Sequence, residues 1–175
     1  MAAAEQKIVL KPGVIHGFLG NFARTPDKES FQFTDINCSG NGLEQLAKAM
    51  EEIKDVQNVD FSYNSIAEIS PMKDLTRIIK LNVSNNKIKN MTVFSMEDAF
   101  PNLQWLDISN NKFQEFPAFK CPKLEYLKIS GNKLEKVNEG WTGHDKLRVI
   151  DAVDNKFKTL APFKSMPKLE ELYMA

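Results

Sequence analysis

Apolar residues recur at fixed distances before an asparagine along most of this chain. In residues 103–111, Leu103, Leu106 and Ile108 stand eight, five and three residues before Asn111. Six copies of this spacing, aligned on their asparagines, follow one another at steps of 23, 22, 25, 21 and 23 residues. A unit repeated at that length predicts a solenoid, in which each copy forms one coil and packs on its neighbours. The six asparagines are Asn41, Asn64, Asn86, Asn111, Asn132 and Asn155.

Each copy also predicts one short strand and one buried asparagine. Apolar and polar residues alternate just before the asparagine, which is typical of a strand with one face towards a core. A carboxamide has two donors and an acceptor, enough to bridge backbone groups of adjacent coils that would otherwise be buried unpaired. We therefore expect the asparagines to lie inside the solenoid, where the chain turns off each strand.

This pattern resembles the leucine-rich repeat, LxxLxLxxNxL, from Phe33 to the end of the chain. The resemblance implies an α/β solenoid with a parallel sheet on its concave side, short helices or turns on its convex side, and partner binding along the concave sheet. The 22-residue spacing is similar to that of the phosphatase-regulatory class of intracellular leucine-rich repeats. That class includes the regulator of type 1 protein phosphatase, a tubulin-binding dynein light chain and radial-spoke proteins of cilia, all of them non-catalytic scaffolds.

The chain divides into residues 1–30, which do not follow the repeat, and residues 31–175, which do. In the first segment, residues 8–10 predict a short strand, Pro12-Gly13 a turn, and the apolar spacing from Val14 to Phe22 a helix. Because a solenoid needs its first coil covered, we predict that residues 1–30 form an N-terminal cap. A segment that docks on a partner is the alternative.

The segments that return from one strand to the next should carry the convex elements. Leu43 to Lys54 has the apolar face of an amphipathic helix, whereas the shorter return from Ile66 to Asp74 predicts a single turn or a 3₁₀ piece. Ser95 followed by Asp98 predicts a capping box in the longest step.

The last residues begin a seventh copy. Leu169, Leu172 and Met174 occupy its first three apolar positions, and its asparagine would fall beyond Ala175. An uncovered coil exposes apolar surface, so we expect either more chain or a partner at this end.

Composition narrows the classes of partner. The chain has 175 residues, 42% of them hydrophobic, and its 23 basic and 23 acidic residues give a formal net charge of zero. This balance favours neither nucleic acid nor an anionic membrane as a partner. We expect no secretory signal, because residues 1–11 contain no apolar core of useful length, and the sequence contains no run of 18 apolar residues. Cys38 and Cys121 fall at core-like positions several repeats apart, which indicates buried thiols and a reducing, cytoplasmic compartment.

Catalysis is not indicated. The two histidines, His16 and His144, lie in the leader and on a return, away from any nucleophile and carboxylate that the repeat would bring to them. Asp60, Asp107 and Asp151 share one strand column, but two strand spacings separate successive members, roughly 9 to 10 Å. That distance is too long for a shared metal or an acid/base pair, so we expect no catalytic residue, metal or cofactor.

Strand residues that point away from the core form the candidate binding surface. Trp105 and Tyr126 should lie on neighbouring strands, about 4.8 Å apart, with charged residues around them. Exposed aromatic residues flanked by charges have the composition of a binding hot spot. A column of serines, two residues before each asparagine, would either let a partner approach closely or keep the surface soluble. The predicted partner-binding residues are Lys80, Trp105, Asp107, Tyr126, Lys128, Asp151 and Tyr173.

The sequence thus predicts a non-catalytic protein-interaction scaffold that belongs to a larger complex. The class it resembles suggests a structural component of a ciliary axoneme or cytoskeletal assembly. A regulatory subunit that binds a protein phosphatase is one alternative. A spliceosomal repeat protein is another, although the neutral charge disfavours it.

Overall fold

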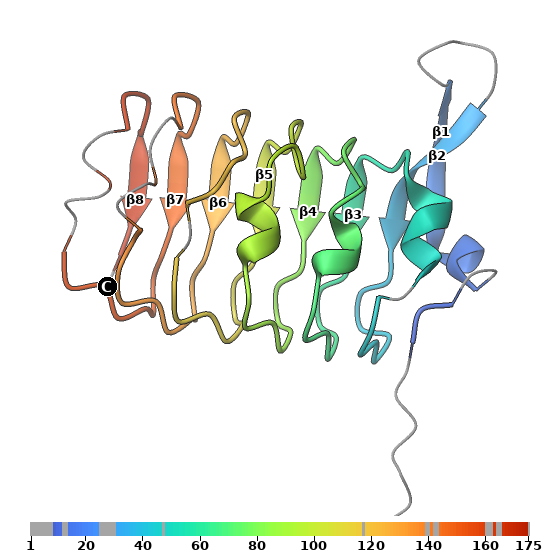
Figure 1. Ribbon diagram of the computed structural model, residues 1–175, viewed down its shortest axis with the longest axis horizontal. Coiled ribbons are helices and arrows are strands. Elements are labelled where there is room, and N and C mark those ends of the chain that lie inside the picture. The colour runs from blue at the N-terminus through green and yellow to red at the C-terminus, as the bar shows by residue number, and fades with distance from the viewer. Residues whose placement is uncertain are drawn as a thin grey trace, which may run out of the picture.

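The protein is a solenoid of stacked coils whose strands form one sheet, as a computed structural model shows (Figure 1). Eight strands follow one another across the sheet in chain order, which confirms the predicted leucine-rich repeat architecture. The residues that the structure describes are 9–11, 14–24, 31–46, 48–116, 118–138, 141, 144–159, 163 and 166–174. The predicted turn at Pro12-Gly13 and the residues Ile8 and Ala175 lie outside this set.

Neighbouring strands from β2 to β8 are parallel and pair equivalent positions of successive repeats. Leu81, for example, pairs with Val59 on one side and with Leu106 on the other. The register is therefore the one that the asparagine alignment implies. The strands are β1 (Leu19–Arg24), β2 (Phe31–Asn37), β3 (Asn58–Asp60), β4 (Lys80–Asn82), β5 (Trp105–Asp107), β6 (Tyr126–Lys128), β7 (Val149–Asp151) and β8 (Glu171–Tyr173).

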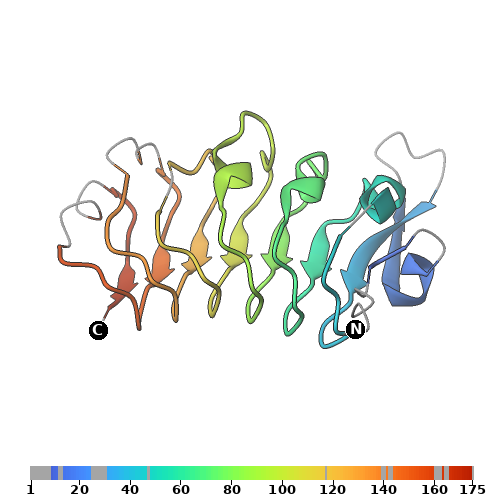
Figure 2. The same cartoon turned by 60° about the horizontal axis from the view of Figure 1, so that its bottom comes forward.

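Short 3₁₀ helices lie on the side of the coils away from the sheet (Figure 2). They are η2 (Lys48–Ile53), η3 (Ser70–Met72) and η4 (Thr92–Ser95), and a further one, η1 (Ile15–Phe18), precedes the first strand. The predicted single turn between Ile66 and Asp74 is confirmed as η3. No helix in the described ranges has the length and hydropathy that a membrane span requires.

The helix predicted from Leu43 to Lys54 is shorter than the pattern suggested. Its apolar face is buried, but η2 begins only at Lys48. The residues before it run alongside the N-terminal segment, where Gln45 forms a parallel bridge with Val9 and accepts a hydrogen bond from the backbone N–H of Leu10. Pairing with this segment replaces the first helical turn.

Two local predictions were wrong. The helix predicted from Val14 to Phe22 ends at Phe18. Leu19–Arg24 instead forms a strand that pairs antiparallel with β2 and so provides hydrogen-bond partners for the edge of that strand. Asn21 on β1 also donates to Asp35 on β2, at 2.6 Å. The expected capping box fails because η4 ends, rather than begins, at Ser95.

Five of the six asparagines are the internal bridges that the sequence predicts. Asn41, in the first repeat, is instead exposed, and its Nδ2 donates to the carbonyl of Ser39 in its own coil. Asn86 shows the arrangement: its Oδ1 accepts the backbone N–H of Ile66 in the previous coil, and its Nδ2 donates to the carbonyl of Phe61 there, both at 2.9 Å. The same Nδ2 donates to the carbonyls of Val83 and Ser84 in its own coil. Equivalent bonds surround Asn64, Asn111, Asn132 and Asn155.

The residue before each asparagine turns the chain through left-handed backbone. Five of the six are glycine, asparagine or aspartate, the types that tolerate positive φ. Tyr63 is the exception: its φ is 54° and its side chain is 67% exposed. This conformation costs a residue with a Cβ roughly 1–2 kcal/mol. The six residues are Gly40, Tyr63, Asn85, Asn110, Gly131 and Asp154.

Both cysteines lie in the core as free thiols, as predicted. Burial raises the pKa of Cys38 and of Cys121 to about 12, and the nearby Asp60 carboxylate adds to the effect at Cys38. A thiol with such a pKa is unreactive at neutral pH, so both residues serve as core hydrophobes.

The asparagine bridges predict a difference between two neighbouring substitutions. Asn111→Leu leaves the buried N–H of Ile88 and three carbonyls without their partner, and should lower the free energy of unfolding by at least about 2 kcal/mol. Ser109→Ala keeps the backbone bonds of the same turn and should cost less than about 1 kcal/mol. Urea denaturation measures both, and equal midpoints would contradict the bridging role.

A buried histidine predicts how stability changes with pH. His144 is 4% exposed and packs on Trp141, and this burial lowers its pKa from the ordinary value of 6.5 despite smaller opposing effects of Phe119 and Asp145. The unfolded chain then binds a proton at a pH where the folded one does not. The contribution of the neutral His144 imidazole to the free energy of unfolding should therefore be fully present above pH 6.5. It should be lost progressively as the pH decreases below that value.

Thermal unfolding of His144→Gln between pH 7 and 5, compared with the wild type, measures this effect. In His144→Gln, the decrease in melting temperature that begins near pH 6.5 should be absent. In His16→Gln, where the side chain is 60% exposed, the decrease should remain. An unchanged slope in His144→Gln would show that the imidazole is not responsible.

Candidate functional site

The sheet face, meaning the outward side chains of β2 to β8, is the surface that the sequence singled out. Its two columns lie side by side along the solenoid, because the register pairs each member with its equivalent in the next repeat. Trp105 pairs with Tyr126 and Asp107 with Lys128, so these predicted neighbours lie together. One column is Asp35, Asn58, Lys80, Trp105, Tyr126, Val149 and Glu171, and the other is Asn37, Asp60, Asn82, Asp107, Lys128, Asp151 and Tyr173.

A cation and two aromatic rings cross the middle of the sheet face. The Nζ atom of Lys80 lies 4.6 Å from the centroid of the Trp105 ring, within the range of a cation–π contact. Trp105 and Tyr126 are each half-buried between their neighbours. Lys80, Trp105 and Tyr126 therefore form a supported row across β4, β5 and β6, which we call the aromatic row.

A charged pair supports one end of this row. Arg148 donates to Glu170 through Nε and Nη2, at 3.0 and 2.8 Å, and its Nη1 lies 3.4 Å from the hydroxyl oxygen of Tyr126. The Arg148 hydrogen bonds hold the pKa of Glu170 below its ordinary value, so the pair stays charged at neutral pH. The strand columns did not reveal Arg148, because it lies one residue before β7.

Tyr173, the last predicted binding residue, is half-exposed at the far end of the sheet face. Its hydroxyl donates to Glu171 at 2.6 Å, and this hydrogen bond raises the pKa of the Tyr173 phenol. The phenol therefore remains neutral, next to a carboxylate on the same strand.

The second column of the sheet face has a structural role that the sequence did not reveal. The Oδ1 of Asp107 accepts the backbone N–H of Ser109 at 2.9 Å, which closes the turn at the end of β5. Asn37, Asp60 and Asn82 make the same bond to the serine two residues later, and Asp151 makes it to Val153. Lys128 breaks this column: it is exposed and forms no ion pair with any described residue.

Three of the five residues in the serine column do not form the open platform or solubilising surface that the sequence suggested. Ser62, Ser84 and Ser109 are buried, because they are enclosed in these turns. The hydroxyls of Ser62 and Ser84 donate to the side chains of Asp60 and Asn82 respectively. The serines shape the edge of the sheet face and offer a partner little area.

The sheet face carries more negative than positive charge. Five of its residues are acidic and two are basic, an imbalance that the net charge of the whole chain conceals. The acidic residues are Asp35, Asp60, Asp107, Asp151 and Glu171, and the basic ones are Lys80 and Lys128.

The carboxylates of this face do not gather into a reactive site. Lys128 lies between Asp107 and Asp151 across three neighbouring strands, as the register shows. Among the residues that the structure describes, no three histidine, cysteine, aspartate or glutamate side chains are arranged to hold a metal ion.

A second surface lies along the turn edge, defined as each asparagine of the last four full repeats and the four residues that follow it. Directly after the asparagine stands an exposed lysine in each of these repeats, Lys87, Lys112, Lys133 and Lys156. The recurring Asn-Lys dipeptide was a signal for this row that the sequence interpretation did not use.

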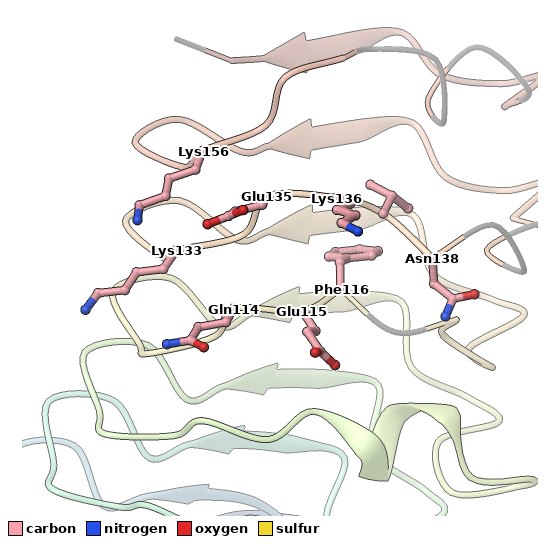
Figure 3. Close-up of a pocket in the computed structure, with 9 residues that line it drawn as sticks. Gln114, Glu115, Phe116, Lys133, Glu135, Lys136, Asn138 and Lys156 are labelled. Atoms are coloured by element: carbon pink, nitrogen blue, oxygen red, sulfur yellow. The ribbon is translucent and has the colours of Figure 1, made fainter.

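A hollow opens beside these lysines and is lined by residues of three successive coils (Figure 3). Its volume is 490 Å³, and Lys133 and Lys156 line it at the end nearest the turns. Phe116 and Val137, both almost fully buried, form its apolar floor.

Comparison with known proteins agrees with the repeat pattern. Residues 101–140 match the family model described as leucine-rich repeats in two copies. Tsukushi from Gallus gallus is 28% identical over 145 residues, which cover 78% of this chain. The chain spans only 39% of the length of that relative.

Solved structures of the same fold align with most of the chain. Internalin C2 from Listeria monocytogenes has a TM-score of 0.59 at 20% identity, covering 81% of this chain and 73% of its own. The structure of a TLR13–ssRNA13 complex has a TM-score of 0.69 at 17% identity, covering 90% of this chain and 23% of its own.

Proposed function

We propose that this chain, a leucine-rich repeat protein, is a non-catalytic scaffold that binds a protein partner on its concave sheet face. The aromatic row is the observation that carries the proposal. Trp105 and Tyr126 offer large contact areas on strands that the asparagine bridges hold in place, so little side-chain freedom is lost on binding. The surrounding charges set the orientation of the partner more than its affinity.

A protein fits this face better than a nucleic acid does. The related solved structure contains TLR13 with an ssRNA, but the sheet face of this chain has five carboxylates against two lysines. Binding to a phosphate backbone depends on clustered lysine and arginine, which this face lacks. A partner surface with basic and apolar residues would complement it.

The setting we propose is the cytoplasm, within a larger complex such as a ciliary axoneme or cytoskeletal assembly. The two buried, unpaired thiols are compatible with a reducing compartment, and the 22-residue spacing favours the class that includes ciliary members. Regulation of a protein phosphatase and a spliceosomal role are the alternatives. Affinity purification of the protein from cells, read by mass spectrometry, distinguishes them by recovering axonemal proteins, a phosphatase catalytic subunit or splicing factors.

The aromatic row predicts how binding responds to substitution. Trp105→Ala removes a half-buried aromatic anchor, so it should weaken binding of the purified partner by about 2 kcal/mol, or roughly thirty-fold in Kd. The fold should be little affected, because this side chain points away from the core. Isothermal titration calorimetry measures the loss. Glu51→Ala, at an exposed position on η2, should leave Kd unchanged.

A second variant separates charge from structure. Asp107→Asn removes the negative charge but keeps an oxygen for the backbone N–H of Ser109, so it should change the salt dependence of binding and not the stability of the fold. If the partner binds Trp105→Ala with Tyr126→Ala as tightly as the wild type, yet fails to bind a protein lacking residues 1–30, the interface lies on the N-terminal segment.

A further inference from the structure

The turn edge carries a strong excess of positive charge. It holds seven lysines and two glutamates, and none of the lysines forms an ion pair within the described part of the chain. The sheet face has an acidic excess, so the zero net charge of the whole chain conceals two surfaces of opposite sign. The lysines are Lys87, Lys89, Lys112, Lys133, Lys136, Lys156 and Lys158, and the glutamates are Glu115 and Glu135.

The four lysines that directly follow an asparagine form a regular row. The backbone N–H of Lys112 donates to the carbonyl of Ile88 in the previous coil at 2.9 Å, and that of Lys133 donates to Phe113 at 2.8 Å. Lys87 and Lys156 are held by equivalent bonds. Adjacent members therefore lie one coil apart, about 4.8 Å along the solenoid. The four ammonium groups therefore stand along one edge of the molecule and raise its local positive potential.

The hollow beside Lys133 and Lys156 adds an apolar component. Its floor is rigid, because Phe116 and Val137 form a parallel bridge and the Phe116 ring packs edge-on against Phe119 and Trp141, at centroid distances of 5.0 and 4.6 Å. Figure 3 shows Lys133 and Lys156 at the end of the hollow nearest the turns, with Phe116 towards its middle. At 490 Å³ it has room for a large side chain.

We propose that the turn edge is a second binding site, which takes an extended acidic peptide segment with one large apolar residue. The apolar side chain enters the hollow over Phe116 and Val137, and flanking carboxylates contact Lys133 and Lys156. The segment continues along the row towards Lys112 and Lys87. This site is separate from the aromatic row, so the protein joins two partners, or two segments of one partner.

The glutamates favour a peptide over a polyphosphate. Glu115 and Glu135 line the same hollow as Lys133 and Lys156, where they would repel an evenly charged chain. A peptide can place carboxylates opposite the lysines and uncharged residues opposite the glutamates. The apolar floor also has no counterpart in the sugar–phosphate backbone of a nucleic acid.

Fluorescence anisotropy with labelled synthetic peptides and the full chain tests the proposal. The probe is a twelve-residue peptide of alternating acidic and small residues with one central leucine, and two matched peptides replace the acids with amides or the leucine with glycine. The acidic leucine peptide should bind, at least ten-fold more tightly than either control and less tightly as salt increases. Absence of binding at low ionic strength would overturn the proposal.

Charge reversal locates the site. Lys133→Glu with Lys156→Glu should weaken binding of the probe at least ten-fold, whereas Lys54→Glu with Lys73→Glu, an equal change at exposed residues outside the turn edge, should weaken it far less. Trp105→Ala should leave it unchanged. Equal losses in both double variants would show a non-specific charge effect, and tighter binding of single-stranded DNA of the same length would identify a phosphate site instead. Either result contradicts the peptide assignment.

Discussion

The carboxamide of the repeated asparagine is the interaction on which the rest of the structure depends. Where each strand ends, the chain turns inside the solenoid and leaves backbone groups of two coils away from water. One asparagine side chain bonds both coils, accepting an N–H from the previous one and donating to carbonyls of both. Each group left unpaired would cost about 1–3 kcal/mol, so a polar residue of this shape holds the stack more firmly than an apolar one would.

Fixed stacking turns each position of the repeat into a row along the molecule. Six residues before the asparagine, the row places Lys80, Trp105 and Tyr126 next to one another on the sheet face. One residue after it, the row places Lys112 beside Lys133 on the turn edge. Surfaces of opposite charge thus arise from a few positions of a 22-residue pattern, although the chain as a whole is neutral.

The features that follow from the repeat could be predicted from the sequence. The strand register, the bridging asparagines and the pairing of Trp105 with Tyr126 all follow once equivalent residues are aligned, because stacking brings equivalent residues together. The pairing of Asp107 with Lys128 was found in the same way.

Features that depend on contacts specific to one repeat could not be predicted. Gln45 lies in an extended segment because Val9 pairs with it, and Leu19–Arg24 is a strand because β2 has a free edge. The helical spacing of apolar residues in these two segments does not reveal that Val9 or β2 will pair with them. The turn-closing bond of Asp107 and the support of Tyr126 by Arg148 likewise required side-chain positions.

Amide hydrogen exchange tests the central role of the asparagine most directly. The N–H groups of Ile66, Ile88 and Leu134 donate to an asparagine side chain of the next coil, at 2.9, 3.0 and 3.1 Å. Residue-resolved exchange should show these three amides to be as slow as that of Val83, which donates to the backbone carbonyl of Asp107. Exchange at the rate of unprotected loop amides, in a protein whose strand amides remain slow, would contradict the account.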